Sequence, residues 1–205
     1  LVCGYQLSTA TSTLKKTLSD NIISSVIKEA LGDNVEYNPW GKINPGSMVF
    51  PFSYNTADGS DHIKAVYNGL NIELGDIELI DEQEYTEEDG HTETNRISQF
   101  KGHWLTCDFG KELAGEVYIS ERTKKTRRSL KSNVTMDNEQ FGTRFCVRAN
   151  NPQEAYYILT PHMMEYITAM ADKSGGTVYL SFLRSGKMHV AVQTGRDFFE
   201  LGKSN

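Results

Sequence analysis

Apolar residues near the start of the chain recur every three or four positions, which places them on one face of an α-helix. The pattern runs through residues 14–31 and comprises Leu14, Leu18, Ile22, Ile23, Val26, Ile27, Ala30 and Leu31. Ser12 is a suitable N-cap and Gly32 a suitable end, so the pattern predicts an amphipathic helix. This helix either packs on a sheet or continues a helix that leads from a membrane.

Farther along the chain, the apolar pattern changes to the two-residue period of β-strands. Residues 62–79 predict two strands that turn near Gly69. Ser185-Gly186 lies between two alternating runs and is typical of a hairpin turn. Residues 36–60 are rich in Tyr, Pro, Gly and Asn, and they predict a loop whose aromatic side chains attach it to the core. Further strands are predicted at 97–108, 115–122, 134–136, 141–149, 177–183 and 188–194.

Two cap-and-proline pairs mark further helices. Asn151-Pro152 predicts a helix over 152–159, and Thr160-Pro161 predicts one over 161–173. Because the strands are not interleaved with helices, the predicted fold class is α+β. We expect a mainly antiparallel sheet with the N-terminal helix and the helical segment 152–173 packed on it. The whole chain, 1–205, is expected to form one soluble domain, with residues 1–11 flexible or acting as a linker from an upstream anchor.

Composition narrows the classes of protein to consider. A hydrophobic content of 38% is enough for a core, so disorder of the whole chain is excluded. The formal net charge of −6 gives no general attraction to nucleic acid or to an anionic membrane, so such binding would need a local patch. The three cysteines lack a CxxC spacing, which argues against a zinc site and favours a reducing compartment. No apolar run approaches the roughly 20 residues of a membrane span.

A basic run after the predicted strand 115–122 is the first choice for a partner surface. It consists of Arg122, Lys124, Lys125, Arg127, Arg128 and Lys131. Such a run can bind phosphate, lipid head groups or RNA. It contains no aromatic residue for base stacking, so a protein or an anionic lipid surface is favoured over nucleic acid. The alternative is a solvated strand end and turn that faces the acidic segment described next.

Seven carboxylates and no Lys or Arg lie within residues 81–93. Clustered carboxylates can hold a hard cation such as calcium, but their spacing does not match the EF-hand loop. The segment therefore indicates a solvated, mobile hairpin tip.

Two weaker groupings could carry chemistry. Asp58, Asp61 and His62 lie close enough in sequence to bind a metal, although this stretch has the composition of a turn. Cys107 could pair with His103 or His189 as nucleophile and base, although a lone thiol in an apolar strand is typical of a core. No cofactor motif is present, so none is predicted.

Several short motifs occur together in a familiar order. They are Tyr37-Asn38-Pro39, Phe100-Lys101-Gly102, residues 141–147 (FGTRFCV), residues 157–165 (YILTPHMME), Ser181-Phe182 and Phe198-Phe199-Glu200. In order and spacing the chain resembles the bacterial family called domain of unknown function 3137, from its first helix to Glu200. The resemblance implies membrane-spanning helices upstream and a position on the cytoplasmic face of the membrane. It carries over no catalytic residue, because the family has no established activity.

Together these features favour a non-enzymatic binding domain of a membrane-anchored bacterial protein. The alternative is an enzyme with an unrecognised site, such as a metal-dependent hydrolase that uses Asp58, Asp61 and His62.

Overall fold

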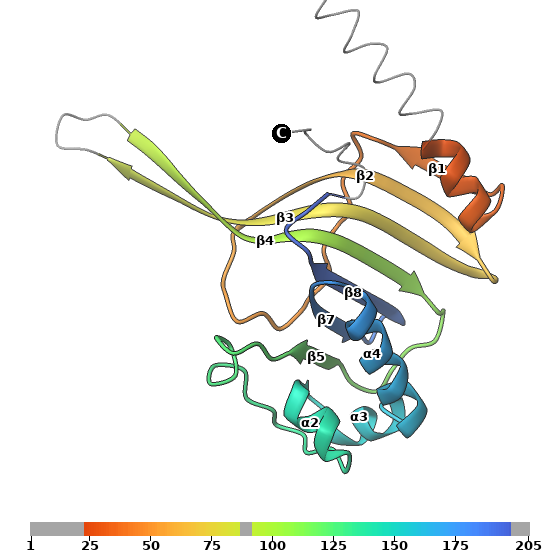
Figure 1. The fold of residues 1–205 in the computed structure, drawn as a ribbon, viewed down its shortest axis with the longest axis vertical. Coiled ribbons are helices and arrows are strands. Elements are labelled where there is room, and N and C mark those ends of the chain that lie inside the picture. The colour runs from red at the N-terminus through yellow and green to blue at the C-terminus, as the bar shows by residue number, and fades with distance from the viewer. Residues whose placement is uncertain (1–22, 87–91, 198–205) are drawn as a thin grey trace, which may run out of the picture.

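The computed structural model describes residues 23–86 and 92–197. Within them, a single antiparallel sheet of eight strands has the order β1-β2-β3-β4-β8-β7-β5-β6 (Figure 1). The strands are β1 (Val35–Asn38), β2 (Thr56–Tyr67), β3 (Leu70–Thr86), β4 (Thr92–Asp108), β5 (Val117–Glu121), β6 (Phe145–Ala149), β7 (Thr177–Phe182) and β8 (Lys187–Gln193). The predicted α+β class with a mainly antiparallel sheet is confirmed.

One face of the sheet carries the helices, which are α2 (Glu139–Arg144), α3 (Pro152–Ile158), α4 (Pro161–Lys173) and a helix of residues 23–31. The main core lies between this face and the helices of the C-terminal half, and Ile119, Leu180 and Ile167 are among its buried members. Ile23 and Ile27 pack on Ile63 of β2, so the N-terminal helix covers the other end of the same face. This agrees with the predicted packing of both helical regions on the sheet.

The opposite face is covered by the loop of residues 39–55 instead of a helix. Phe50 of this loop stacks on Phe52 with ring centroids 4.8 Å apart, and it meets Tyr179 of β7 edge-on at the same distance. Beneath the loop, Trp104 and Phe100 of β4 are each 1% exposed. Phe50 and Phe52 thus attach the loop to the core, as the sequence predicts, whereas Trp40 of the same predicted loop is 73% exposed and Tyr37 belongs to β1.

The β2–β3 hairpin turns at Asn68-Gly69, where the two φ angles are +50° and +80°. Left-handed φ at both central residues is the requirement of a type I′ turn, which Asn-Gly meets at low cost. The predicted turn near Gly69 is confirmed by this geometry.

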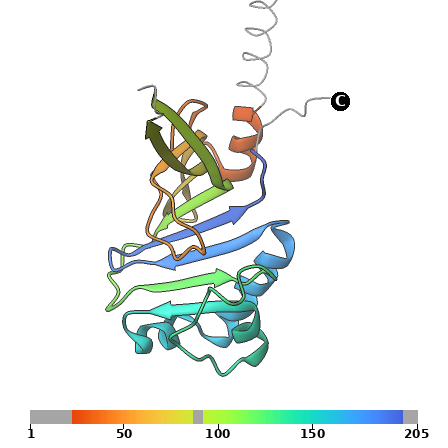
Figure 2. The ribbon, with the colours of Figure 1, turned by 90° about the vertical axis from the view of Figure 1, so that its left-hand side faces the viewer.

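Strands β3 and β4 are 17 residues long and extend past the rest of the sheet. Pairing between β2 and β3 begins at Thr56 and Ile80, so the ribbon beyond Ile80 has two strands only. We call residues 81–86 and 92–97 of this ribbon the acidic arm; it projects away from the body of the molecule (Figures 1 and 2). Residues 81–86 and 92–93, predicted as part of a hairpin tip, are therefore paired strand residues, and residues 87–91 lie outside the described residues.

Two strand predictions and one loop prediction need correction. Residues 134–136 form no strand, because Val134 and Met136 reach the core from an irregular segment. Residues 139–144 form α2, whose cap Asn138 accepts a hydrogen bond from the Phe141 amide, so the strand begins only at Phe145. Residues 56–60, predicted as loop, belong to β2.

The two cap-and-proline predictions agree closely with the structure. Thr160 accepts a hydrogen bond from the Met163 amide, and α4 covers the predicted range. Residues 14–22 of the predicted first helix lie outside the described part of the chain, while residues 23–31 are helical up to Gly32. Among the helices described, none has the length and apolar character needed to cross a membrane.

Candidate functional site

The predicted basic run forms a loop of residues 122–131 between β5 and α2, which we call the basic loop. Its first residue, Arg122, is half-buried and anchors the loop. The Arg122 Nε donates to the carbonyl oxygen of Leu130 (3.1 Å). Nη1 donates to the carbonyl oxygens of Gly142 (2.6 Å) and Phe145 (2.5 Å), and Nη2 donates to Ser132 Oγ (2.9 Å). Arg122 therefore joins the basic loop to α2 and β6.

Short-range hydrogen bonds fix the turn inside the basic loop. The Thr123 amide donates to Thr126 Oγ1 (2.9 Å), and the Thr126 amide donates to Thr123 Oγ1 (3.2 Å). The Leu130 amide donates to the Thr126 carbonyl (3.0 Å), and the Leu130 side chain is 4% exposed. The loop backbone is thus held at its start, its middle and its end.

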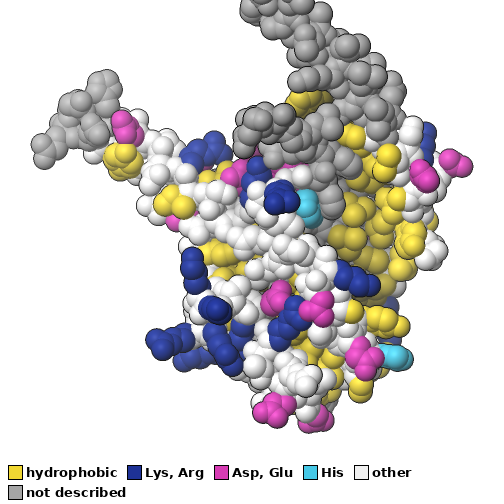
Figure 3. All heavy atoms as spheres, viewed as in Figure 1, with side chains coloured by type: hydrophobic (Ala, Val, Ile, Leu, Met, Phe, Trp, Pro, Cys, Tyr) yellow, Lys and Arg dark blue, Asp and Glu magenta, His cyan; other side chains and the backbone are white. Residues whose placement is uncertain are grey.

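The other five cations of the basic loop are exposed: Lys124, Lys125, Arg127, Arg128 and Lys131. In the part of the chain that the structure describes, none of them has a carboxylate within ion-pair distance. Figure 3 shows Lys and Arg side chains gathered over this side of the molecule. A fixed backbone with five exposed cations that no described carboxylate pairs with is an arrangement that can bind an anionic surface.

The basic loop does not meet the acidic arm of its own chain. The two lie well apart in Figures 1 and 2, with β8, β7 and β5 between them in the sheet. No ion pair joins residues 122–131 to the described carboxylates of the arm. The interpretation of the basic run as a turn that faces the acidic segment is therefore not supported for these residues.

The sheet edge beside the basic loop is closed. The amide group of Asn133 pairs with both backbone groups of Ala149 on β6, each at 2.9 Å. Ser132 Oγ accepts a hydrogen bond from the Val147 amide (3.0 Å). These side chains take the place of a neighbouring strand, so β6 offers little free edge to a partner strand.

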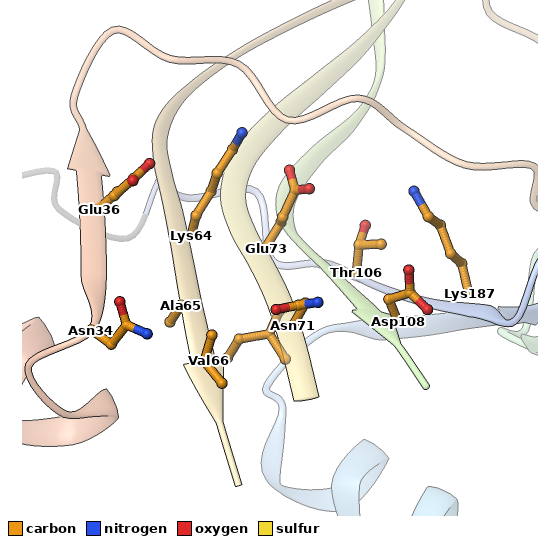
Figure 4. Close-up of a pocket in the computed structure, with 11 residues that line it drawn as sticks. Asn34, Glu36, Lys64, Ala65, Val66, Asn71, Glu73, Thr106, Asp108 and Lys187 are labelled. Carbon is orange, nitrogen blue, oxygen red and sulfur yellow. The ribbon is translucent and has the colours of Figure 1, made fainter. Parts of the chain in front are cut away.

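A groove lies on the loop-covered face, beside residues 39–55 (Figure 4). Its volume is about 380 Å³, and five strands contribute polar side chains that point to the same side: Glu36, Lys64, Glu73, Thr106, Asp108 and Lys187. Register explains the arrangement, because Glu36, Lys64, Glu73 and Thr106 are successive cross-strand neighbours. Sequence reasoning missed this groove, since its residues are scattered from position 34 to 187.

The row of polar side chains continues from Thr106 to its cross-strand neighbour His189, which is buried. His189 Nδ1 lies 3.2 Å from Trp104 Nε1 and 2.9 Å from Thr106 Oγ1. Because an indole N–H can only donate, Nδ1 must accept, and the proton of the neutral ring is on Nε2. Burial lowers the pKa of His189, which agrees with a neutral ring. Gly46 of the covering loop allows close contact, since a Cβ there would lie 2.3 Å from His189 Nε2.

The three predicted metal ligands each have another partner. Asp58 pairs with Lys42 (2.7 Å), and this contact lowers the pKa of Asp58. Asp61 accepts a hydrogen bond from the Tyr37 hydroxyl, and His62 Nε2 lies 2.8 Å from Glu73. All three residues belong to β2 and not to a turn.

Within residues 23–86 and 92–197, no group of three or more His, Cys, Asp or Glu side chains is placed to hold a metal. The metal site at Asp58, Asp61 and His62 stays a prediction, one that this arrangement does not favour.

The suggested nucleophile–base pairs with Cys107 are not formed. Cys107 is buried, and this burial raises the pKa of its thiol. Cross-strand pairing places Cys107 opposite Met188, so the next residue, His189, points to the other face of the sheet. His103 Nδ1 is instead 2.7 Å from the buried carboxylate of Asp76.

The side chains of Asp76, His103 and Thr194 are in contact in the sequence carboxylate, imidazole, hydroxyl, as in the catalytic triad of a hydrolase. Thr194 Oγ1 lies 3.3 Å from His103 Nε2. However, the same hydroxyl donates to the carbonyl oxygen of Arg196 (3.0 Å), so its proton is not directed at the imidazole. The arrangement fits a link between β4 and the segment after β8 better than an activated nucleophile.

A family model described as "Protein of unknown function (DUF3137)" matches residues 98–205, which is more than half of the chain. The chain belongs to this family. The match includes the basic loop and the helices α2 to α4, but not β1 to β3 or the covering loop 39–55. The matched range is thus shorter than the resemblance, which already includes the motif Tyr37-Asn38-Pro39. No curated protein and no solved structure matches the chain.

Proposed function

We propose that this DUF3137 domain is a non-enzymatic interaction domain whose basic loop binds an acidic protein surface. The observation that carries the proposal is the set of five exposed cations, without carboxylate partners among the described residues, on a backbone held by Arg122. A preformed loop loses little conformational entropy on binding, which favours recognition by charge.

Composition of the basic loop favours protein over lipid or nucleic acid. The apolar side chain that would insert into a membrane is missing, because Leu130 is buried beneath the loop. Aromatic residues for base stacking are also missing from residues 122–131. An acidic protein surface needs neither feature.

The setting of the domain is also part of the proposal. We place it in a membrane-anchored bacterial protein, at the cytoplasmic face of the membrane. This placement rests on the upstream membrane helices that the family resemblance implies.

Binding to poly-L-glutamate, measured by titration calorimetry at low and high salt, tests the proposed function. The loop variant replaces four of the exposed cations by Gln: Lys124→Gln, Lys125→Gln, Arg127→Gln and Arg128→Gln. Exposed ion pairs contribute about 0.2–1 kcal/mol each, so removing four cations is expected to weaken binding by roughly fourfold to a thousandfold.

A control with the same net charge removes four exposed cations elsewhere: Lys28→Gln, Arg148→Gln, Lys173→Gln and Arg184→Gln. It is expected to bind nearly as well as the unchanged protein. Equal losses in both variants would show a general charge effect and refute the role of the loop. Binding to phosphatidylserine vesicles without binding to polyglutamate would identify a lipid surface instead.

A further inference from the structure

The acidic arm is a protein surface of the kind that the basic loop is proposed to bind. Its described residues carry four carboxylates, Asp81, Glu82, Glu84 and Glu93. The single cation of the arm, Arg96, pairs with Glu82 at 3.2 Å. The arm thus keeps a negative charge that the described residues do not neutralise.

Among the described residues, the acidic arm has little support from outside it: the Asn55 side chain hydrogen-bonds the backbone of Glu82 (2.6 and 2.9 Å), but only at the base of the arm. Beyond Ile80 it has no pairing with β2, and β4 pairs with β8 only from His103 onward. Tyr85 and Ile97 of the arm are 48% and 44% exposed. An isolated two-stranded ribbon is at best marginally stable in water, so contact with another surface would stabilise it.

The arm and the basic loop lie on the same side of the molecule. Figure 1 shows both at the left, the arm above and the loop below, and Figure 2 shows both toward the viewer in the same relation. A second copy turned by 180° about an axis between them would bring its loop to the first arm and its arm to the first loop. One twofold axis therefore satisfies both contacts at once.

We infer that two copies of this chain form a twofold symmetric dimer in which the acidic arm of each copy docks on the basic loop of the other. The inference rests on the proposed function, because it names the acidic surface that the loop binds. Charge complementarity supports a second copy of the chain as the partner. Because each chain has one acidic arm and one basic loop, every arm in a dimer has a loop to bind.

Charge reversal and mixing test the dimer, with association of the 205-residue chain measured by analytical ultracentrifugation. The loop-reversed variant carries Lys124→Glu, Lys125→Glu, Arg127→Glu and Arg128→Glu. The arm-reversed variant carries Asp81→Lys, Glu84→Lys and Glu93→Lys, together with Glu87→Gln, Glu88→Gln and Asp89→Asn, so that the net charge of residues 81–97 becomes positive. The unchanged protein is expected to dimerise at low salt and to dissociate at least tenfold more readily in about 0.5 M salt.

Each reversed variant alone is expected to be monomeric, because its arm and its loop then carry the same sign of charge. An equimolar mixture of the two is expected to form a 1:1 heterodimer, since both contacts are again between opposite charges. A chain with both sets of changes is expected to dimerise like the unchanged protein. Circular dichroism and melting of each variant confirm that it is folded.

Two results would overturn the inference: an unchanged protein that stays monomeric at low salt, or folded variants whose mixture fails to associate. If polyglutamate still binds the basic loop in that case, the proposed function stands and the partner is another acidic protein. If polyglutamate does not bind either, the proposed function fails as well.

Discussion

Replacing Arg122 by Gln is expected to destabilise the whole C-terminal half of the fold. The substitution removes donors that reach the backbone of the basic loop, of α2 and of β6. The carbonyl oxygens that they satisfy are part-buried, so water replaces only some of the lost hydrogen bonds. Arg127→Gln is the matched control, because Arg127 has the same charge but its side chain is exposed.

The size of the effect follows from the hydrogen bonds of Arg122. Four donated bonds of 3.1 Å or less join its guanidinium to its neighbours. Bonds from a charged donor contribute about 1.5–3 kcal/mol each, but bonds that share one side chain do not add independently. Since the residue is half-buried, we expect a loss of about 3 kcal/mol of unfolding free energy. For a chain of this size that corresponds to a drop of roughly 6–12 °C in Tm.

Thermal unfolding followed by calorimetry and circular dichroism measures this effect. The Arg127→Gln control is expected to stay within about 0.5 kcal/mol of the unchanged protein. Arg122→Lys is expected to recover part of the loss, because an ammonium keeps the charge and three donors. An Arg122→Gln variant as stable as its control would refute the structural role of Arg122.

Two further predictions concern the sheet. Burial lowers the pKa of His189 in the folded protein. The contribution of the neutral His189 ring to the unfolding free energy should therefore be complete above pH ~7. It should be lost as the pH falls from the unfolded pKa of about 6.5 toward the lower folded pKa. Urea unfolding at several pH values should show a flatter profile for His189→Gln, and an unchanged slope would contradict this. At Gly102 a Cβ would lie 2.0 Å from the Val192 carbonyl oxygen. Gly102→Ala should therefore cost about 3 kcal/mol in the same assay; under 1 kcal/mol would refute that close contact.

Local signals in the sequence account for the predictions that agree best with the structure. Thr160-Pro161 and Asn151-Pro152 fix helix starts through hydrogen bonds within three residues, so sequence suffices to locate them. The turn at Asn68-Gly69 is equally local. Val134 and Met136 alternate like strand residues, but whether they pair with a strand depends on distant backbone groups. Sequence could not show that they reach the core without pairing.

The features of the candidate site also differ in whether the sequence alone could reveal them. The cations of the basic loop are neighbours in sequence and could be recognised as a run. The role of Arg122 could not be recognised, because it depends on the carbonyl groups of Gly142 and Phe145, which lie 20 and 23 positions downstream. The polar groove was also hidden, since cross-strand register brings Glu36 and Lys187 to one face.

A residue-resolved titration with poly-L-glutamate shows whether the basic loop is the part of the molecule that binds an acidic polymer. Amide chemical shifts of the isotope-labelled protein are followed by NMR as the polymer is added at low salt. If the basic loop binds, salt-sensitive shift changes concentrate in residues 123–131. Shift changes spread evenly over Lys28, Lys173 and other surface cations, or no shift changes in the basic loop, would refute its role in binding.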